Sequence, residues 1–129
     1  MISNATIQAA FNDLLIAANL GYPVSWPGLS FTPPDSGVWF EAKFLPNRGV
    51  DDRLSNQGHV SPQGIYQITV FSRPQSEIKL REAVEIVAAA FPAGTAVTGS
   101  VRTTKRPFSG VMQSDGDRVS VALSIEYGE

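Results

Sequence analysis

The chain has no cysteine and a single histidine, and these two scarcities exclude several kinds of site. Without cysteine there is no disulfide, no thiolate metal site and no cysteine nucleophile, and the composition fits the reducing cytoplasm. A serine–histidine–aspartate system would need His59, which lies near Asp52, Ser55 and Ser61 in the sequence. No G-x-S-x-G nucleophile elbow is present. We therefore interpret His59 as a solvated loop residue and do not expect an enzyme.

Charge is also scarce. Charged residues make up 17% of the 129-residue chain, and the formal net charge is −2. This share lies below the usual quarter, which suits a protein that hides part of its surface in an assembly. No apolar run approaches membrane-spanning length, and the N-terminal MISNATIQ has neither the basic nor the apolar part of an export signal. We expect one soluble domain of residues 1–129 with no membrane contact.

Two amphipathic helices are predicted. Apolar residues recur every three or four positions from Ile7 to Ala18, so we expect a helix over 4–19 that is capped by Ser3 and ended by Gly21. A second stripe from Leu80 to Phe91 predicts a helix over 77–91, capped by Ser76.

The remaining patterned segments predict strands. Residues 24–26 form a short candidate, and residues 38–45 alternate, with Val38 on the core face and Trp39 on the other. Residues 64–71 are apolar on both sides, which predicts a central strand covered on both faces. Further strands are expected at 95–104 and, after a DGD turn, at 118–127, and residues 107–113 are expected to form a short strand or an extended arm. The predicted fold class is α+β, in the order α-β-β-β-α-β-β-β. Two helices would pack on one face of a mostly antiparallel sheet of about five to six strands.

Residues 46–61 separate two predicted strands without any helical or strand period. Structureless loops of this length are uncommon in compact domains and are usually functional or disordered. The segment carries charges of both signs, Arg48, Asp51, Asp52 and Arg53. We expect a long mobile loop that becomes ordered on contact with a partner; the alternative is a merely disordered surface loop.

No pattern predicts a metal or cofactor site. The adjacent acids Asp51 and Asp52 and the SDGD run at 114–117 both lack the later ligands of a calcium loop. PAGTAVTGS has two glycines but no Lys-Ser or Lys-Thr ending, so it does not predict a phosphate-binding loop.

Two further groups of residues are candidate interfaces. Arg102, Lys105 and Arg106 form the only basic cluster, and with the aromatic residues Trp39, Tyr66 and Phe108 they allow single-stranded nucleic acid as an alternative partner. An acidic protein neighbour is the interpretation we favour. A half-apolar strand face that carries Trp39, Glu41, Lys43 and Leu45 would suit a protein contact, unless the chain's own N-terminal segment covers it.

Several segments, taken in order, resemble the phage tail-terminator-like family. They are VSWPGLSFTPP, GVWFEAKFLP, SPQGIYQITVF, the helix end AAAFPAGT and the final VALSIEYGE. The resemblance covers nearly the whole chain and is structural rather than catalytic.

The resemblance implies a non-enzymatic subunit that forms a ring, expected to be a hexamer, on the last ring of tail-tube protein. Such a ring stops tube growth and offers a surface for joining the head through the head–tail connector proteins. The expected location is the bacterial host cytoplasm during assembly, and then the virion tail. In this family the long loop between two strands is typically mobile and near the ring contacts, and residues 46–61 occupy that place.

Three other functions stay open from the sequence. A head-completion or neck adaptor, or a tail-tube-like subunit, would share the size and fold class. A small nucleic-acid-binding module would use Arg102, Lys105 and Arg106. A small hydrolase would be built around His59.

Overall fold

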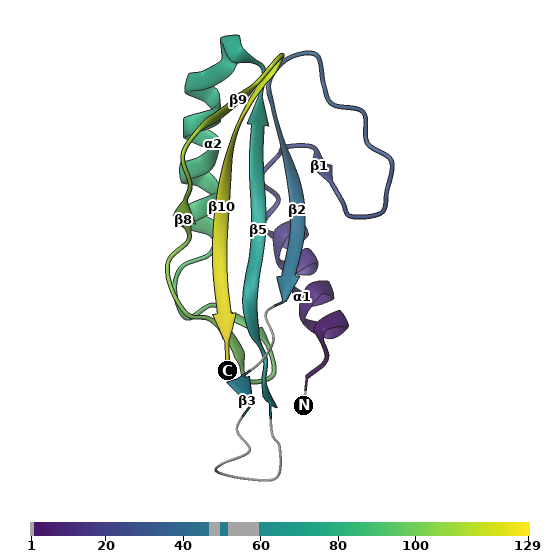
Figure 1. Ribbon diagram of the computed structural model, residues 1–129, viewed down its shortest axis with the longest axis vertical. Coiled ribbons are helices and arrows are strands. Elements are labelled where there is room, and N and C mark those ends of the chain that lie inside the picture. Colours follow the sequence, from purple (N-terminus) through teal and green to yellow (C-terminus); the bar gives the residue numbers. More distant parts are fainter. Residues whose placement is uncertain (1, 47–49, 52–59) are drawn as a thin grey trace.

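The structure is a computed structural model that describes residues 2–46, 50–51 and 60–129 (Figure 1). The elements run in the order α1 (Asn4–Ala18), β1 (Val24–Ser25), β2 (Val38–Pro46), β3 (Val50–Asp51), β4 (Val60–Ser61), β5 (Gln63–Ser72), the 3-10 helix η1 (Pro74–Ser76), α2 (Glu77–Ala90), β6 (Ala96–Thr98), β7 (Val101–Thr103), β8 (Phe108–Ser109), β9 (Gln113–Asp115) and β10 (Arg118–Gly128). Neither α-helix of these residues is long and apolar enough to cross a membrane.

The main sheet has the strand order β1-β2-β5-β10-β7-β6, and β8 and β9 pair with β10 beside β7. All of these pairs are antiparallel except β1 with β2. The long central strands are β5 and β10, which stay in register from Gln63↔Gly128 to Ser72↔Val119. The α+β prediction, with two helices and a mostly antiparallel sheet, is confirmed.

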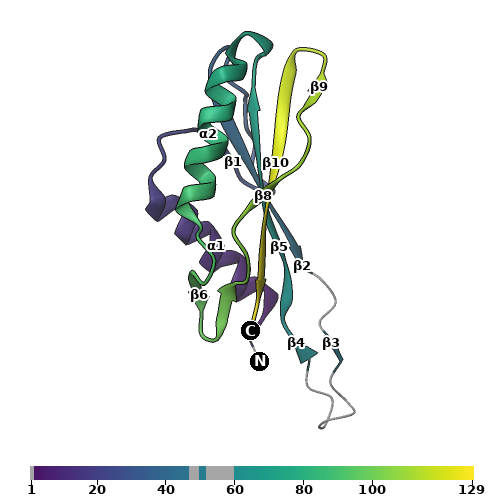
Figure 2. The same ribbon diagram turned by 90° about the vertical axis from the view of Figure 1, so that its left-hand side faces the viewer.

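Both helices cover the same face of the sheet, and the other face carries no helix (Figure 2). The core therefore lies between the helices and one side of β2, β5 and β10. Ile7, Phe11 and Leu15 of α1 are buried there, as are Leu80, Ala83 and Val87 of α2. Phe11 stacks on Tyr66 of β5 with ring centroids 4.6 Å apart. The apolar stripe that the sequence predicts for each helix is therefore the face that the helix buries against the sheet.

The helix ends differ in part from the prediction. Ser3 caps α1 as expected, since the Thr6 amide donates to its hydroxyl at 3.1 Å. The helix stops earlier than predicted, because Asn19 takes the left-handed conformation (φ 48°) and its amide bonds back to Ile16. Ser76 makes no side-chain cap bond. Ser76 is instead the last residue of η1, and α2 begins at the next residue.

Three strand predictions need correction. Residues 95–104 form a hairpin rather than one strand, because Gly99 adopts φ 54° and reverses the chain between β6 and β7. The segment 46–61 contains the paired strands β3 and β4, although its sequence shows no strand period. The strand β5 is central, but only one of its faces is buried; the other is half-exposed because no helix covers it.

Candidate interaction surface

The described residues hold no group of three histidines, cysteines, aspartates or glutamates placed to bind a metal ion. His59, the proposed centre of a hydrolase, lies outside the described residues, as does Asp52.

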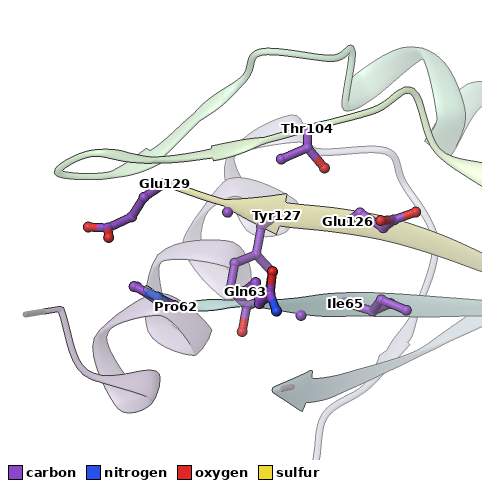
Figure 3. A pocket seen from close by; sticks show the side chains of 9 residues that line it. Pro62, Gln63, Ile65, Thr104, Glu126, Tyr127 and Glu129 are labelled. Carbon is purple, nitrogen blue, oxygen red and sulfur yellow. The ribbon is translucent and has the colours of Figure 1, made fainter. Parts of the chain in front are cut away.

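The concavity at the ends of β5 and β10 has a volume of about 300 Å³ and is lined by residues 62–65, 104 and 126–129. Its two carboxylates, Glu126 and Glu129, point away from each other (Figure 3). Paired acid–base catalysis by carboxylates needs both groups to converge on one substrate. The geometry of this concavity therefore does not offer a carboxylate pair.

The uncovered side of the sheet, which we call the open face, is mainly polar. It consists of the side chains that alternate with the core residues: Trp39, Glu41, Lys43 and Leu45 on β2; Ile65, Gln67, Thr69 and Phe71 on β5; Arg118, Ser120, Ala122, Ser124 and Glu126 on β10. In the middle of this face, cross-strand rows place Glu41 beside Thr69 and Thr69 beside Ala122. Glu41 and Lys43 form an exposed ion pair of 3.9 Å. Such a pair contributes little to stability, so both charges are available to a partner.

One end of the open face is closed by a cluster of aromatic and arginine side chains. Trp39 stacks on Phe71 with centroids 5.5 Å apart, and the guanidinium groups of Arg73 and Arg118 lie 5.1 and 5.6 Å from the Trp39 ring. Trp39 is consequently only 2% exposed. The covering groups belong to the end of β5 and the start of β10. The proposed contact of Trp39 with a neighbouring protein stays a prediction. Such a contact would require Arg73 and Arg118 to move away from the ring.

Arg73 also ties three distant segments together. Its Nε and one terminal nitrogen donate to the Pro34 carbonyl at 3.1 and 2.9 Å, and its other terminal nitrogen reaches an Asp117 carboxylate oxygen at 2.7 Å. The loop before β2, the end of β5 and the β9–β10 turn therefore meet at one side chain. No sequence pattern pointed to this residue, because its partners Pro34 and Asp117 lie 39 and 44 positions away from it.

The basic cluster lies along the opposite edge of the sheet from β1. Arg102 is on β7 beside Gly128, and Lys105 is 3.5 Å from Glu126. Two of the aromatic residues considered for stacking on nucleic acid, Trp39 and Tyr66, are buried at 2% and 1% exposure, whereas Phe108 is 48% exposed. Bases stack on exposed rings, so the cluster offers one such ring and not three.

Within the charged segment 46–61, the structure describes residues 46, 50–51 and 60–61. Asp51 belongs to β3. Arg48 and Arg53 lie outside the described residues, together with Asp52.

Comparisons with known proteins decide the family. A family model described as the phage tail terminator protein matches residues 6–127. This chain belongs to the phage tail terminator family. A terminator of this family is a structural, non-enzymatic component of a phage-like virion tail, so the expectation that the chain is not an enzyme is confirmed.

Two solved structures share the fold of this terminator. One superposes with a TM-score of 0.76 at 25% sequence identity, covering 99% of this chain and 96% of that chain. The other is a chain of the virion of a native gene transfer agent (GTA) particle, with a TM-score of 0.64, 14% identity and coverage of 94% and 92%. None of the curated proteins matches this chain.

The tail-terminator family fits the surface described above. The molecule presents an open sheet face and a basic cluster at one edge of the sheet. Functional chemistry in a structural tail protein consists of contacts with other proteins.

Proposed function

We propose that this protein caps the tail tube as a ring, expected to be a hexamer, which stops tube growth and helps to join the tail to the head. The observation that carries this proposal is the family match over residues 6–127. Assembly would take place in the bacterial cytoplasm. The partners would be other copies of the chain, the tail-tube protein and the head–tail connector proteins.

A ring needs two different contact patches on each subunit, because every copy meets one neighbour on each side. The proposed patches are Arg102, Lys105 and Arg106 on one edge, and Glu41 and Lys43 on the other side of the sheet. Their separation is supported by the strand order, which places β7 and β2 on opposite sides of the β5–β10 pair. Trp39 is proposed as a contact next to Glu41. The charges of the 46–61 segment, Arg48, Asp51, Asp52 and Arg53, are proposed as additional contacts on sequence grounds alone.

Tube growth in the presence of this protein tests the proposal. Tail-tube protein polymerised with increasing amounts of this chain should give progressively shorter tubes, with a single added ring at one end in electron micrographs. A second assay asks whether capped tails join to heads more often than uncapped tails. The same tube assay on a chain that lacks residues 47–57 tests the contribution of the charged segment. Normal capping by that shortened chain would contradict an assembly role for it.

The opposite outcomes point to other functions. If the chain alone polymerises into long tubes, it is a tail-tube-like subunit. If it leaves tube length unchanged but binds the head connector, it is a neck adaptor. Tight binding to single-stranded nucleic acid that weakens steeply with salt would instead support the nucleic-acid module.

A further inference from the structure

The loop between β1 and β2 gives the molecule a projecting apolar knob. β1 pairs with β2 only at Phe40 and Glu41, after which the chain turns at Trp26–Leu29, where the Leu29 amide donates to the Trp26 carbonyl at 3.2 Å. The loop that follows stands away from the edge of the sheet (Figure 1). Leu29 in this turn is 67% exposed. A large apolar side chain on a projecting loop is well placed to enter a groove on another molecule.

A matching groove lies at the other edge of the sheet. It runs between α2 and the β8–β9 arm, which we define as residues 104–117, and has a volume of about 300 Å³. Val84, Met112 and Val121 supply its apolar lining, and Arg81 and Glu85 are its charged lining residues. The arm also leaves Phe108 48% and Val111 84% exposed beside the groove. Each copy of the chain therefore carries a knob on one edge and a groove on the other.

Charge is unevenly distributed along the two edges. Residues 2–46, which include the knob, carry a net charge of −2 from Asp13, Asp35, Glu41 and Lys43. Residues 101–109 carry +3 from Arg102, Lys105 and Arg106, whereas the whole β8–β9 arm has no net charge, because Asp115 and Asp117 balance Lys105 and Arg106. Opposite charges steer two surfaces together and fix their orientation.

One pair of opposite charges lies next to the knob and the groove. Asp35 lies on the loop, and Arg81 lines the groove, where its guanidinium is 3.9 Å from the Met112 sulfur. Within the part of the chain that the structure describes, no ion pair joins either residue to another. Both charges are therefore free for a neighbouring copy.

We propose that the β1–β2 loop of one copy docks into the groove of the next, with Leu29 against Val84 and Met112 and with Asp35 facing Arg81. The occupant of the groove is a second copy of this chain, because the same chain carries both complementary halves on opposite edges. Contacts of this head-to-tail kind build rings when the rotation closes. The inference rests on the proposed ring and assigns the surfaces that hold it together.

A cross-linking experiment tests the contact, and the absence of native cysteine makes it specific. Leu29→Cys and Met112→Cys are made as separate variants, mixed on tail-tube protein and treated with a short bismaleimide. The mixture should give one cross-linked dimer species, and the double variant should give a ladder that ends at the number of subunits in the ring. Ala9→Cys, on an exposed position of α1, replaces Leu29→Cys in the matched control and should not cross-link to Met112→Cys.

A charge exchange provides the second measurement. Asp35→Arg or Arg81→Asp alone should weaken self-association at least tenfold, and the chain with both substitutions should recover most of it. This contact alone would be overturned if wild-type protein forms rings but both tests fail. In that case the Leu29→Cys and Met112→Cys variants cross-link no more than the control, and the charge exchange has no effect on self-association. Wild-type protein that never assembles on tail-tube protein would overturn the ring function, and this contact with it.

Discussion

The two faces of β5 show how one strand can serve the fold on one side and a surface on the other. On the helix side, Tyr66, Ile68 and Val70 are at most 1% exposed. On the open side, Ile65, Gln67, Thr69 and Phe71 alternate with them and are only half-buried. Neighbouring positions on one strand therefore differ in what a substitution would cost. Stability resides mainly on the helix side, and the open side can vary with the needs of assembly.

A pair of adjacent substitutions on β5 tests most directly whether its helix side contributes more to stability than its open side. Ile68→Ala empties a position that is 0% exposed, so the free energy of unfolding should fall by about 2–5 kcal/mol. Thr69→Ala, one residue further on the open face, should cost less than about 1 kcal/mol. Urea unfolding followed by circular dichroism measures both. Equal losses would show that the open face is as important to the fold as the core.

At one end of the open face, the side chains of Phe71, Arg73 and Arg118 bury the Trp39 ring. This end therefore tests whether the open face contributes to stability where it is covered. Arg73→Met removes the bonds to Pro34 and Asp117, and should lower the free energy of unfolding by about 1.5–3 kcal/mol. In a Trp26→Phe background, the emission of Trp39 should also shift to longer wavelength as water reaches the indole.

The matched control for Arg73 is Arg118→Met. Arg118 also lies over Trp39, but its ion pair with Asp117 is longer, at 3.7 Å, and is exposed. Its loss should cost less than about 1 kcal/mol and leave the emission nearly unchanged. If both variants behave alike, the bonds of Arg73 to Pro34 and Asp117 do not hold this end closed.

A smaller effect than that of Ile68→Ala or Arg73→Met concerns a polar group inside the core. The hydroxyl of Tyr66 donates to the Asn12 side-chain oxygen at 2.6 Å. Tyr66→Phe should lower the free energy of unfolding by about 1 kcal/mol at neutral pH, because the Asn12 oxygen loses its donor.

Tyr66 also predicts a dependence of stability on pH. Burial raises the pKa of the Tyr66 phenol in the folded chain, so the folded state holds this proton more tightly than the unfolded state. Its contribution to stability is complete below the unfolded pKa of about 10 and declines as the pH rises above that value. Unfolding measured at about pH 8 and about pH 11 should show a smaller alkaline loss for Tyr66→Phe than for wild type. If Tyr66→Phe loses as much stability at alkaline pH as wild type, the loss comes from other groups. One of them is Tyr127, whose pKa is also raised by burial.

Local patterns were enough to predict the helices and the long strands. The three-to-four spacing in α1 and α2 and the strict alternation in β10 each follow from contact with one apolar layer, so their periods are visible in the sequence. The phage tail terminator resemblance was read from the order of such segments, and the family match confirmed it. Short elements were harder to predict. β3, β4 and the β6–β7 turn depend on pairing geometry over two or three residues, which leaves almost no period to detect.

The sequence by itself determined the fold class, the buried stripe of each helix and the absence of cysteine chemistry, because these depend on composition and on neighbours a few positions away. Only the tertiary structure decided that one face of β5 stays open, that Trp39 lies beneath Arg73 and Arg118, and that a knob and a groove occupy opposite edges of the sheet. These features bring together residues tens of positions apart. Their physical cause is the packing of whole elements, which no local pattern of side chains encodes.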